Sequence, residues 1–250
     1  MIKDISVVIM AKDAQATINK CLESLVEFGE VILYLNDTTD NTKEIASKFD
    51  NVKVIDGEFL GFGPTKNKAA KYSSNDWILS LDSDEVLSSN FVENLKQLTL
   101  NLNNVYSILR TNFYKQSQIK HCWGNDIIVR LYNKTKTSFI DQKVHEYVIT
   151  DGFDTIELDG FVEHYPYSTV TDFIVKLDRY STIFAQDNVG KKSSSPIKAF
   201  FNSQFSFLKT YFIKRGFLDG YAGLVIAFSH MATNFYKYIK LYELNKELKK

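Results

Sequence analysis

The chain is 250 residues long, and 44% of them are hydrophobic and 24% are charged. This length and composition suit one large or two small folded domains with an ample core, and they exclude a disordered tail. Thirty basic residues balance thirty acidic ones, so no overall field draws the protein to nucleic acid. Any basic patch must therefore be local, and no nucleic-acid partner is expected.

Cysteine usage and hydropathy bear on the compartment. Cys21 and Cys122 lie far apart and have neither CxxC nor Cys/His spacing, so we expect no disulfide scaffold and no zinc site. The apolar run at the N-terminus is too short for the core of a signal peptide. The longest uncharged apolar stretch, Gly220 to Met231, falls well short of the roughly 20 residues of a transmembrane helix. We expect a cytoplasmic protein that does not span a membrane.

The first part of the chain alternates between strand and helix patterns. Short apolar runs bounded by turn residues predict buried strands at Ile5–Met10, Val31–Leu35, Val52–Ile55 and Trp77–Leu81. Helical patterns lie between them, over residues 18–26, after a cap at Asp40, and over residues 65–72. This alternation predicts βαβ units, and hence an α/β fold with a mostly parallel sheet.

Polar residues follow each of these strands, at positions 11–13, 36–37, 56–57 and 82–84. Because the carboxyl ends of parallel strands share an edge, they predict a polar crevice of the kind that a nucleotide occupies. Asp82, Ser83 and Asp84 directly follow the fourth strand. Two carboxylates with this spacing suit Mg²⁺ or Mn²⁺ bridging to a phosphate, although such residues are more often a solvated turn or a helix cap.

The pattern changes after a helix predicted over residues 91–102. Strands are expected at Val105–Arg110 and Ile127–Tyr132, around a long aromatic and polar loop that contains Trp123, Asn125 and Asp126. A long insertion beside a nucleotide-binding sheet is where a second substrate would be held, and we assign these three residues to the acceptor. Trp123 is also a candidate for the core.

From about Thr169 the chain shows long helical segments rich in Phe and Tyr, interrupted at residues 193–196. We therefore expect a first domain over residues 1–168 and a helical C-terminal region over residues 169–250. The basic and aromatic content of that region suits an anionic membrane surface, although packing against the first domain or a second subunit is an equally ordinary use.

Two further clusters could carry chemistry. A glycine-bearing loop at residues 61–64 runs into a helix that opens with Lys66 and Asn67, which suits a phosphate but equally a tight turn before a solvated helix. His145-Glu146 and Glu163-His164 each place imidazole beside carboxylate, a combination used for metal ligation and for proton transfer. Either pair could instead be structural.

Taken in chain order, the motifs form a longer pattern that spans nearly the whole chain. They are Ser6–Ile9, Thr39–Thr42, Gly61–Asn67, Trp77–Glu85, Arg130–Tyr132, Val144–Glu146 and Gly216–Gly220. This order resembles the family 2 glycosyltransferases, and in particular the bacterial lipopolysaccharide-core β-glucosyltransferases. Several motifs in the right order are far more specific than an Asp-x-Asp alone.

The resemblance implies a GT-A fold, a UDP-sugar donor, Mn²⁺ or Mg²⁺, and inversion at the anomeric centre. It implies that Glu146 is the catalytic base with His145 beside it, and that the metal ligands are Asp84, Asp82 and His164. The nucleotide-sugar contacts that it implies are Ala11, Asp13, Asn36, Asp37, Lys66, Asn67, Asp82 and Ser83. One departure stands out: many relatives carry a carboxylate where this chain has Leu35-Asn36, so Asn36 or Asp37 would have to contact the uracil.

The resemblance also implies a function and a place of work. A hexose, with glucose favoured, would be moved from UDP to a lipid-anchored saccharide, the inner-core heptose of lipopolysaccharide or lipooligosaccharide. The enzyme would then work at the inner face of the inner membrane, with peripheral contact through the C-terminal helices. Two alternatives remain: a sugar nucleotidyltransferase, which would carry a glycine-rich basic loop that Met10–Ala14 lacks, and a non-catalytic carbohydrate-binding or scaffold protein.

Overall fold

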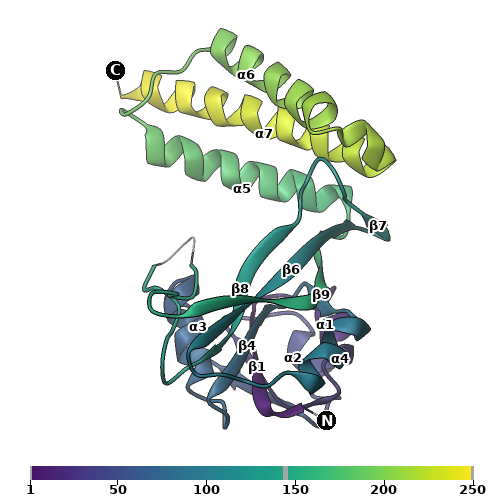
Figure 1. Ribbon diagram of the computed structural model, residues 1–250. Coiled ribbons are helices and arrows are strands. Elements are labelled where there is room, and N and C mark those ends of the chain that lie inside the picture. The colour runs from purple at the N-terminus through teal and green to yellow at the C-terminus, as the bar shows by residue number, and fades with distance from the viewer. Residues whose placement is uncertain (1, 143–145, 249–250) are drawn as a thin grey trace. The chain divides into compact units, whose positions relative to one another are not determined.

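A computed structural model of the protein describes residues 2–142 and 146–248 (Figure 1). The chain divides into two compact units, which are described separately here. The first comprises Met1–Thr111 and Asn125–Tyr165, and the second comprises Asn112–Gly124 and Pro166–Lys250. The predicted boundary at residue 168 stays a prediction.

The first unit is built on a twisted sheet with the strand order β3-β2-β1-β4-β8-β6-β9-β5. Its parallel half contains β1 (Ile2–Ala11), β2 (Phe28–Leu35), β3 (Val52–Asp56) and β4 (Trp77–Asp82). The other half contains β5 (Glu85–Leu87), β6 (Asn104–Tyr114), β8 (Asp126–Asn133) and β9 (Asp154–Tyr167), and its β4–β8, β6–β8 and β5–β9 pairs are antiparallel. The α/β class is thus confirmed, with a sheet that is parallel in one half and mixed over its full width.

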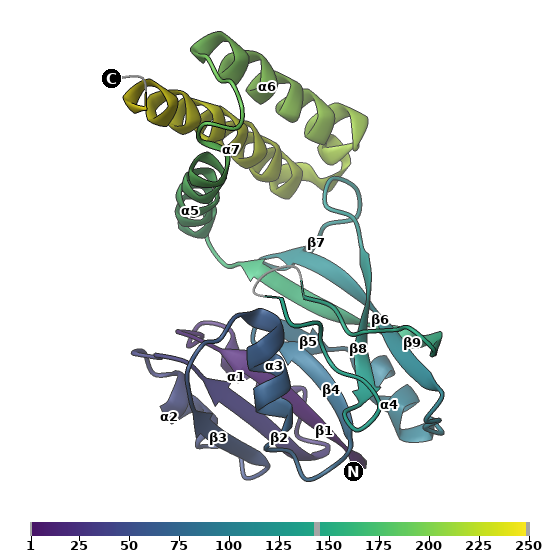
Figure 2. The ribbon, with the colours of Figure 1, turned by 90° about the vertical axis from the view of Figure 1, so that its left-hand side faces the viewer.

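Helices cover both faces of this sheet, because successive strand residues point to opposite sides. Val7 and Ile9 pack in one core cluster with residues of α1 (Ile18–Glu23) and α4 (Ser89–Gln97). Val8 packs in a second cluster with Ala69 and Ala70 of α3 (Phe62–Ala70), and Figure 2 shows α3 on the face opposite α1. Burial on both faces explains why these strands are almost continuously apolar.

The remaining connections of the first unit are short. The helix α2 (Thr42–Ala46) lies between β2 and β3, and the carboxylate of Asp40 accepts the backbone N–H of Thr42 at 3.0 Å. Ser88 caps α4 by accepting the backbone N–H of Phe91. Ser88 is thus a true N-cap. The cap predicted at Asp40 is wrong by one position, because the N-cap of α2 is Asn41 and Asp40 bonds the first helical residue instead.

The second unit is helical apart from the strand β7 (Ser117–Gln118) and the ends of β6 and β9. Its helices are α5 (Val170–Asn188), α6 (Pro196–Leu208), the π-helical turn η1 (Lys209–Ile213), the 3₁₀ turn η2 (Gly216–Asp219) and α7 (Gly220–Glu247). The predicted C-terminal helical region is therefore present. Within the described part of the chain, no helix has both the length and the apolar character needed to cross a bilayer.

Candidate functional site

The carboxyl ends of the parallel strands form one polar edge in the first unit. In register, Ala11 of β1 pairs with Leu35 of β2, which pairs with Asp56 of β3, while Met10 pairs with Asp82 of β4. The residues that follow these strands therefore begin at the same edge, as strand order alone predicts.

The turns after β1 and β2 are tied together. Asp13 and Asp37 both have a φ of 48°, a left-handed conformation that Asp tolerates better than most residues. The Asp13 carboxylate accepts the backbone N–H of Thr39 at 2.8 Å, and the N–H of Asn36 donates to the carbonyl of Ala11 at 3.2 Å. Asp13 thus fixes the turn after β2, beside which Asn36 is buried.

Asp82 ends β4 between two cations. Lys66 Nζ donates to its Oδ1 at 2.9 Å, and Arg130 Nη2 donates to its Oδ2 at 2.7 Å. Burial alone favours the neutral acid, but the charges of Arg130 and Lys66 outweigh burial and hold the pKa of Asp82 far below its usual range. The carboxylate is therefore ionised and engaged with protein cations.

A buried carboxylate, Glu85, lies behind Asp82. It accepts the backbone N–H of Asp82 at 2.9 Å and pairs with Arg110 at 3.2 Å and with Arg130 at 3.4 Å. Arg110 pairs in turn with Asp126 at 2.9 Å. Together these groups form a charged network in which each buried ion has a partner, the condition under which buried charge is tolerated.

Sequence reasoning assigned no role to Arg110, Arg130 or Glu85. A signal was present, because Arg110 ends the apolar run of β6 and Arg130 interrupts the apolar run of β8. An arginine inside a buried strand requires a carboxylate partner.

Glu146 reaches the same network from a separate loop. Lys66 Nζ, which is almost fully buried, donates to Glu146 Oε1 at 3.0 Å while also holding Asp82. A short antiparallel pairing presents the loop, since Phe139 bridges Val148. His145 lies outside the described residues.

Helix α3 holds the segment of residues 139–142. The side-chain amide of Asn67 donates to the carbonyl of Phe139 at 2.8 Å and accepts its N–H at 2.9 Å. Gly63 N–H donates to Gln142, and a Cβ on Gly63 would lie 2.1 Å from the carbonyl oxygen of Ile140. Asn67 therefore positions this segment, and its predicted contact with the nucleotide stays a prediction.

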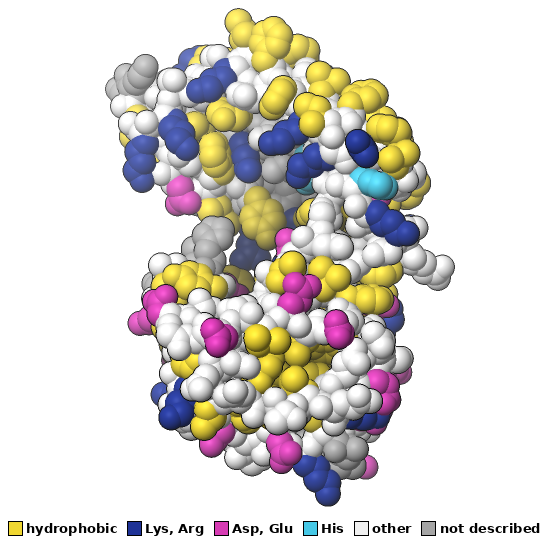
Figure 3. All heavy atoms as spheres, viewed as in Figure 1, with side chains coloured by type: hydrophobic (Ala, Val, Ile, Leu, Met, Phe, Trp, Pro, Cys, Tyr) yellow, Lys and Arg dark blue, Asp and Glu magenta, His cyan; other side chains and the backbone are white. Residues whose placement is uncertain are grey.

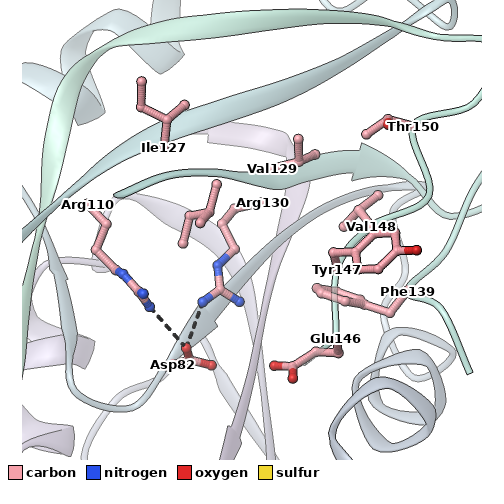
Figure 4. A pocket seen from close by; sticks show the side chains of 11 residues that line it. Asp82, Arg110, Ile127, Val129, Arg130, Phe139, Glu146, Tyr147, Val148 and Thr150 are labelled. Atoms are coloured by element: carbon pink, nitrogen blue, oxygen red, sulfur yellow. Dashed lines mark hydrogen bonds and ion pairs between the residues drawn. The ribbon is translucent and has the colours of Figure 1, made fainter. Parts of the chain in front are cut away.

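Asp82, Arg130 and Glu146 border a pocket of about 370 Å³ within the first unit (Figure 4). Figure 4 shows Asp82, Arg130 and Glu146 converging at one end, with the aromatic rings of Phe139 and Tyr147 beside Glu146. The other lining residues are Arg110, Ile127, Ile128, Val129, Val148 and Thr150. A concave site with apolar walls and a few converging charged groups is the usual form of a small-molecule site.

The predicted metal ligands are only partly brought together. Ser83 and Asp84 form the turn between β4 and β5, and pairing of Glu85 with His164 places Asp84 Oδ2 3.6 Å from His164 Nε2. Asp82 is instead paired with Lys66 and Arg130, and the described residues contain no group of three or more His, Cys, Asp or Glu side chains able to hold a metal. The structure therefore brings Asp84 and His164 together and pairs Asp82 with cations, and the assignment of all three residues to a metal stays a prediction.

The predicted acceptor residues fall in different units. Asn125 and Asp126 belong to the first unit, where Asp126 is paired with Arg110. Trp123 belongs to the second, where its ring centroid lies 5.3 Å from that of Tyr167 and it packs against the core cluster. The structure therefore gives Trp123 a packing role, and its contact with an acceptor stays a prediction.

The fold and the site define an α/β protein with a pocket of charged and apolar side chains beside the carboxyl end of β4. The glycosyl transferase family 2 model matches residues 6–152, and the chain belongs to this family. An uncharacterized glycosyltransferase of Rickettsia typhi is 30% identical over 97% of this chain and 88% of its own length.

Two further comparisons are more distant. The lipopolysaccharide core biosynthesis glycosyltransferase LpsC of Rhizobium meliloti is 24% identical over 90% of this chain and 89% of its own length. The structure of S. aureus TarS in complex with UDP aligns with 98% of this chain and 91% of that chain, with a TM-score of 0.46 and 16% identity.

Proposed function

We propose that the protein is an inverting glycosyltransferase that moves a hexose, with glucose favoured, from a UDP-sugar to a saccharide acceptor. The proposed acceptor is the inner-core heptose of lipopolysaccharide or lipooligosaccharide. Membership of the family supports sugar transfer, and the relative LpsC, a lipopolysaccharide core biosynthesis glycosyltransferase, supports a lipopolysaccharide-core acceptor. The family match also favours a glycosyltransferase over a sugar nucleotidyltransferase.

One observation carries the proposal: Lys66 joins Glu146 to Asp82 beside the pocket. Asp82 ends a parallel strand at the edge where α/β sheets bind nucleotides, whereas Glu146 comes from a separate loop. A donor bound along that edge would place its sugar near Glu146. The carboxylate would then accept the proton of an acceptor hydroxyl as that oxygen attacks the opposite face of the sugar, and a single displacement inverts the anomeric centre.

Metal use belongs to the same proposal. Asp84 and His164 offer one oxygen and one nitrogen ligand 3.6 Å apart, and sites for Mg²⁺ in nucleotide enzymes commonly combine one or two carboxylates with phosphate oxygens and water. These two residues therefore fit Mn²⁺ or Mg²⁺, which would neutralise charge on the departing diphosphate. Asp13, Asn36 and Asp37, with the backbone at Ala11, would surround the uridine, and Ser83 would lie beside the diphosphate.

Peripheral contact with the inner face of the inner membrane completes the proposal, because a lipid-anchored acceptor would be reached there. The helices of the second unit would make this contact.

The test is UDP release from a panel of UDP-hexoses, measured with and without purified inner-core acceptor in detergent. We expect one donor, UDP-glucose first, to release UDP faster when the acceptor is present, and the product to have the opposite anomeric configuration by NMR. A product of retained configuration would refute the single displacement. No UDP release from any donor would favour a non-catalytic carbohydrate-binding protein.

A further inference from the structure

The burial pattern of helix α6 is the reverse of the pattern usual for a helix on a protein surface. It buries small residues, Ala199 and Ser203, whereas Phe201 and Phe205 are 66% and 60% exposed. Exposed helices ordinarily bury their large apolar side chains and present polar ones. A large apolar surface on this helix therefore has no covering within its own unit.

The inner side of α6 is fixed by polar contacts with α7, so the helix cannot roll to bury its phenylalanines without losing them. Asn234 of α7 donates to the hydroxyl of Ser206 at 2.8 Å. In η1, which continues α6, the hydroxyl of Thr210 lies 3.0 Å from Nδ1 of His230. Burying these groups without their partners would cost free energy, which locks the phenylalanines outward.

The exposed apolar surface continues beyond α6. Its members are Ile197, Phe200, Phe201, Phe205, Leu208, Phe212, Ile213, Phe217 and Leu218. We call this surface, together with Lys209, Lys214 and Arg215, the apolar–basic face. On α6, exposed apolar residues recur every three or four positions, so they share one side of the helix. Such a cluster marks an interaction site, because isolated apolar residues need no cover and a cluster does.

The charge around this surface has one sign. Residues 189–218 contain no Asp or Glu. The cations assigned to the face are Lys209, Lys214 and Arg215, because Lys192 and Lys198 lie over aromatic rings of the second unit. Lys209, Lys214 and Arg215 are exposed, and none of them forms an ion pair with another residue that the structure describes. Figure 3 shows hydrophobic and basic side chains together over the helical unit, with few acidic ones.

We propose that the apolar–basic face docks on a lipid bilayer that contains anionic phospholipid. Its phenylalanines would enter the boundary between headgroups and acyl chains, while the lysines pair with phosphate groups. A second copy of the chain is a poorer occupant, because a two-fold interface would set this cationic surface against itself. The inference rests on the peripheral contact proposed above, and it specifies the surface and the lipid.

The structure also shows why the basic residues of α7 are less suitable. Lys240 donates to the Asp178 carboxylate and to the Thr182 hydroxyl, both at 2.7 Å. Lys237 lies over the ring of Phe184. These cations are used inside the second unit, so the contact surface moves to α6 and the turns that follow it.

The test is co-sedimentation of the full-length protein with vesicles of phosphatidylcholine, with or without phosphatidylglycerol. We expect binding only to the anionic vesicles, weakened by added salt. Lys209→Gln/Lys214→Gln should weaken it about tenfold or more, because each cation near an anionic surface contributes about 1 kcal/mol. The matched control, Lys48→Gln/Lys53→Gln, changes two exposed lysines of the first unit and should bind like wild type.

A second pair of variants tests the apolar contribution. Phe201→Gln/Phe205→Gln should also lose most of the binding, whereas Ile174→Gln/Val175→Gln, which changes equally exposed apolar residues of α5, should not. Equal sedimentation of wild type and the Phe201→Gln/Phe205→Gln variant would overturn the proposal. A concentration-dependent dimer that this variant abolishes, without vesicle binding by wild type, would also overturn it and assign the face to a second copy.

The same variants are assayed for UDP release from the UDP-sugar donor in the presence of a water-soluble acceptor fragment. Unchanged release with lost vesicle binding supports the docking face. Absence of release in wild type would count against the proposed sugar transfer, and the sedimentation result would stand on its own.

Discussion

Glu146 is the single side chain on which the proposed chemistry depends. Glu146→Gln keeps the shape and the contact to Lys66 but cannot accept a proton, so the turnover rate should fall by about 10²–10⁴-fold. Affinity for UDP should change little, since the group acts on the acceptor. Steady-state UDP release and calorimetry with UDP measure the two effects.

The control for this variant is Asp141→Asn, which alters an exposed carboxylate near the same loop. It should transfer sugar like wild type. Near-normal transfer by Glu146→Gln would move the base to Asp141 or to Asp126.

Asp84 allows a separate test of metal use. Asp84→Asn retains the shape of the turn but removes the charged oxygen 3.6 Å from His164. If a divalent ion bridges this carboxylate to the donor, the variant should lose most of the gain in UDP affinity that Mn²⁺ gives to wild type. Calorimetry with UDP, in Mn²⁺ and in EDTA, gives this difference; an undiminished gain would remove Asp84 from the metal site.

His230 makes the stability of the helical unit depend on pH. Burial, helped by Lys214 and Lys237, lowers the pKa of His230 from 6.5 to about 4. Between pH 6.5 and pH 4, His230 is therefore protonated in the unfolded chain but neutral in the folded chain. Its contribution to the unfolding free energy is fully present above pH 6.5 and is lost as the pH falls toward 4. The full effect is about 3 kcal/mol.

The variant His230→Gln isolates this effect from that of the carboxylates. Between pH 7 and pH 4, the unfolding free energy of wild type should fall by about 3 kcal/mol more than that of His230→Gln. Urea unfolding followed by far-UV circular dichroism measures the difference. Parallel pH profiles for the two proteins would show that folding does not lower the pKa of His230.

The sequence indicated which residues of the motifs could carry chemistry, but not which side chains would form ion pairs with them. Asp82 was predicted as a metal ligand because it follows an apolar strand. Its two cations come from α3 and β8, which are distant in sequence, and nothing in the local pattern of either element indicates which carboxylate it will meet. The ion-paired state of Asp82 is therefore a property of the tertiary structure.

At the scale of elements, the packing of α3 against the Glu146 loop should control activity. Gly63→Ala would place a methyl group 2.1 Å from the Ile140 carbonyl, so the segment must move away from the helix. We expect a loss of about 1–3 kcal/mol in stability, typical of overpacking, and a marked loss of turnover because Glu146 shifts. Denaturant unfolding and UDP release measure both.

Gly29→Ala is the matched control, because its Cβ would meet its nearest neighbour, the Ile2 carbonyl, at an ordinary 3.6 Å. It should leave turnover unchanged. Wild-type turnover in Gly63→Ala would mean that the position of Glu146 does not depend on this contact.

The strands that could be predicted from the sequence are more buried or longer than those that could not. Three of the parallel strands, β1, β2 and β4, are buried on both faces and read as apolar runs, so they were located within a few residues. The edge strand β3 is only half-buried, but its short apolar run was found as well. The strands β5 and β9 were missed. β5 has three residues, and the first four residues of β9 are exposed, which removes the alternation that marks a half-buried strand.

At the scale of the whole molecule, the second unit is assembled from two stretches of chain. The insertion at residues 112–124 contributes Tyr114, Ile119 and Cys122 to a core cluster that is completed by residues of α5 and α7. The carboxylate of Asp219 accepts the backbone N–H groups of residues 120, 121 and 122 at 2.9, 3.2 and 2.8 Å. A boundary drawn in sequence at residue 168 would separate these partners.

This arrangement predicts how fragments of the protein will behave. A fragment ending at residue 168 keeps the insertion but loses Phe173 and Ile226, so Tyr114, Ile119 and Cys122 become exposed to water. We expect it to associate and to bind a hydrophobic dye.

A second fragment ends at residue 165 and replaces residues 112–124 with a short Gly/Ser turn, which can close because Arg110 and Asp126 are paired in register. It should be monomeric and unfold cooperatively. Size-exclusion chromatography and dye fluorescence compare the two; if the first fragment is equally monomeric and binds no dye, the insertion needs no helical partner, and residue 168 is a true domain boundary.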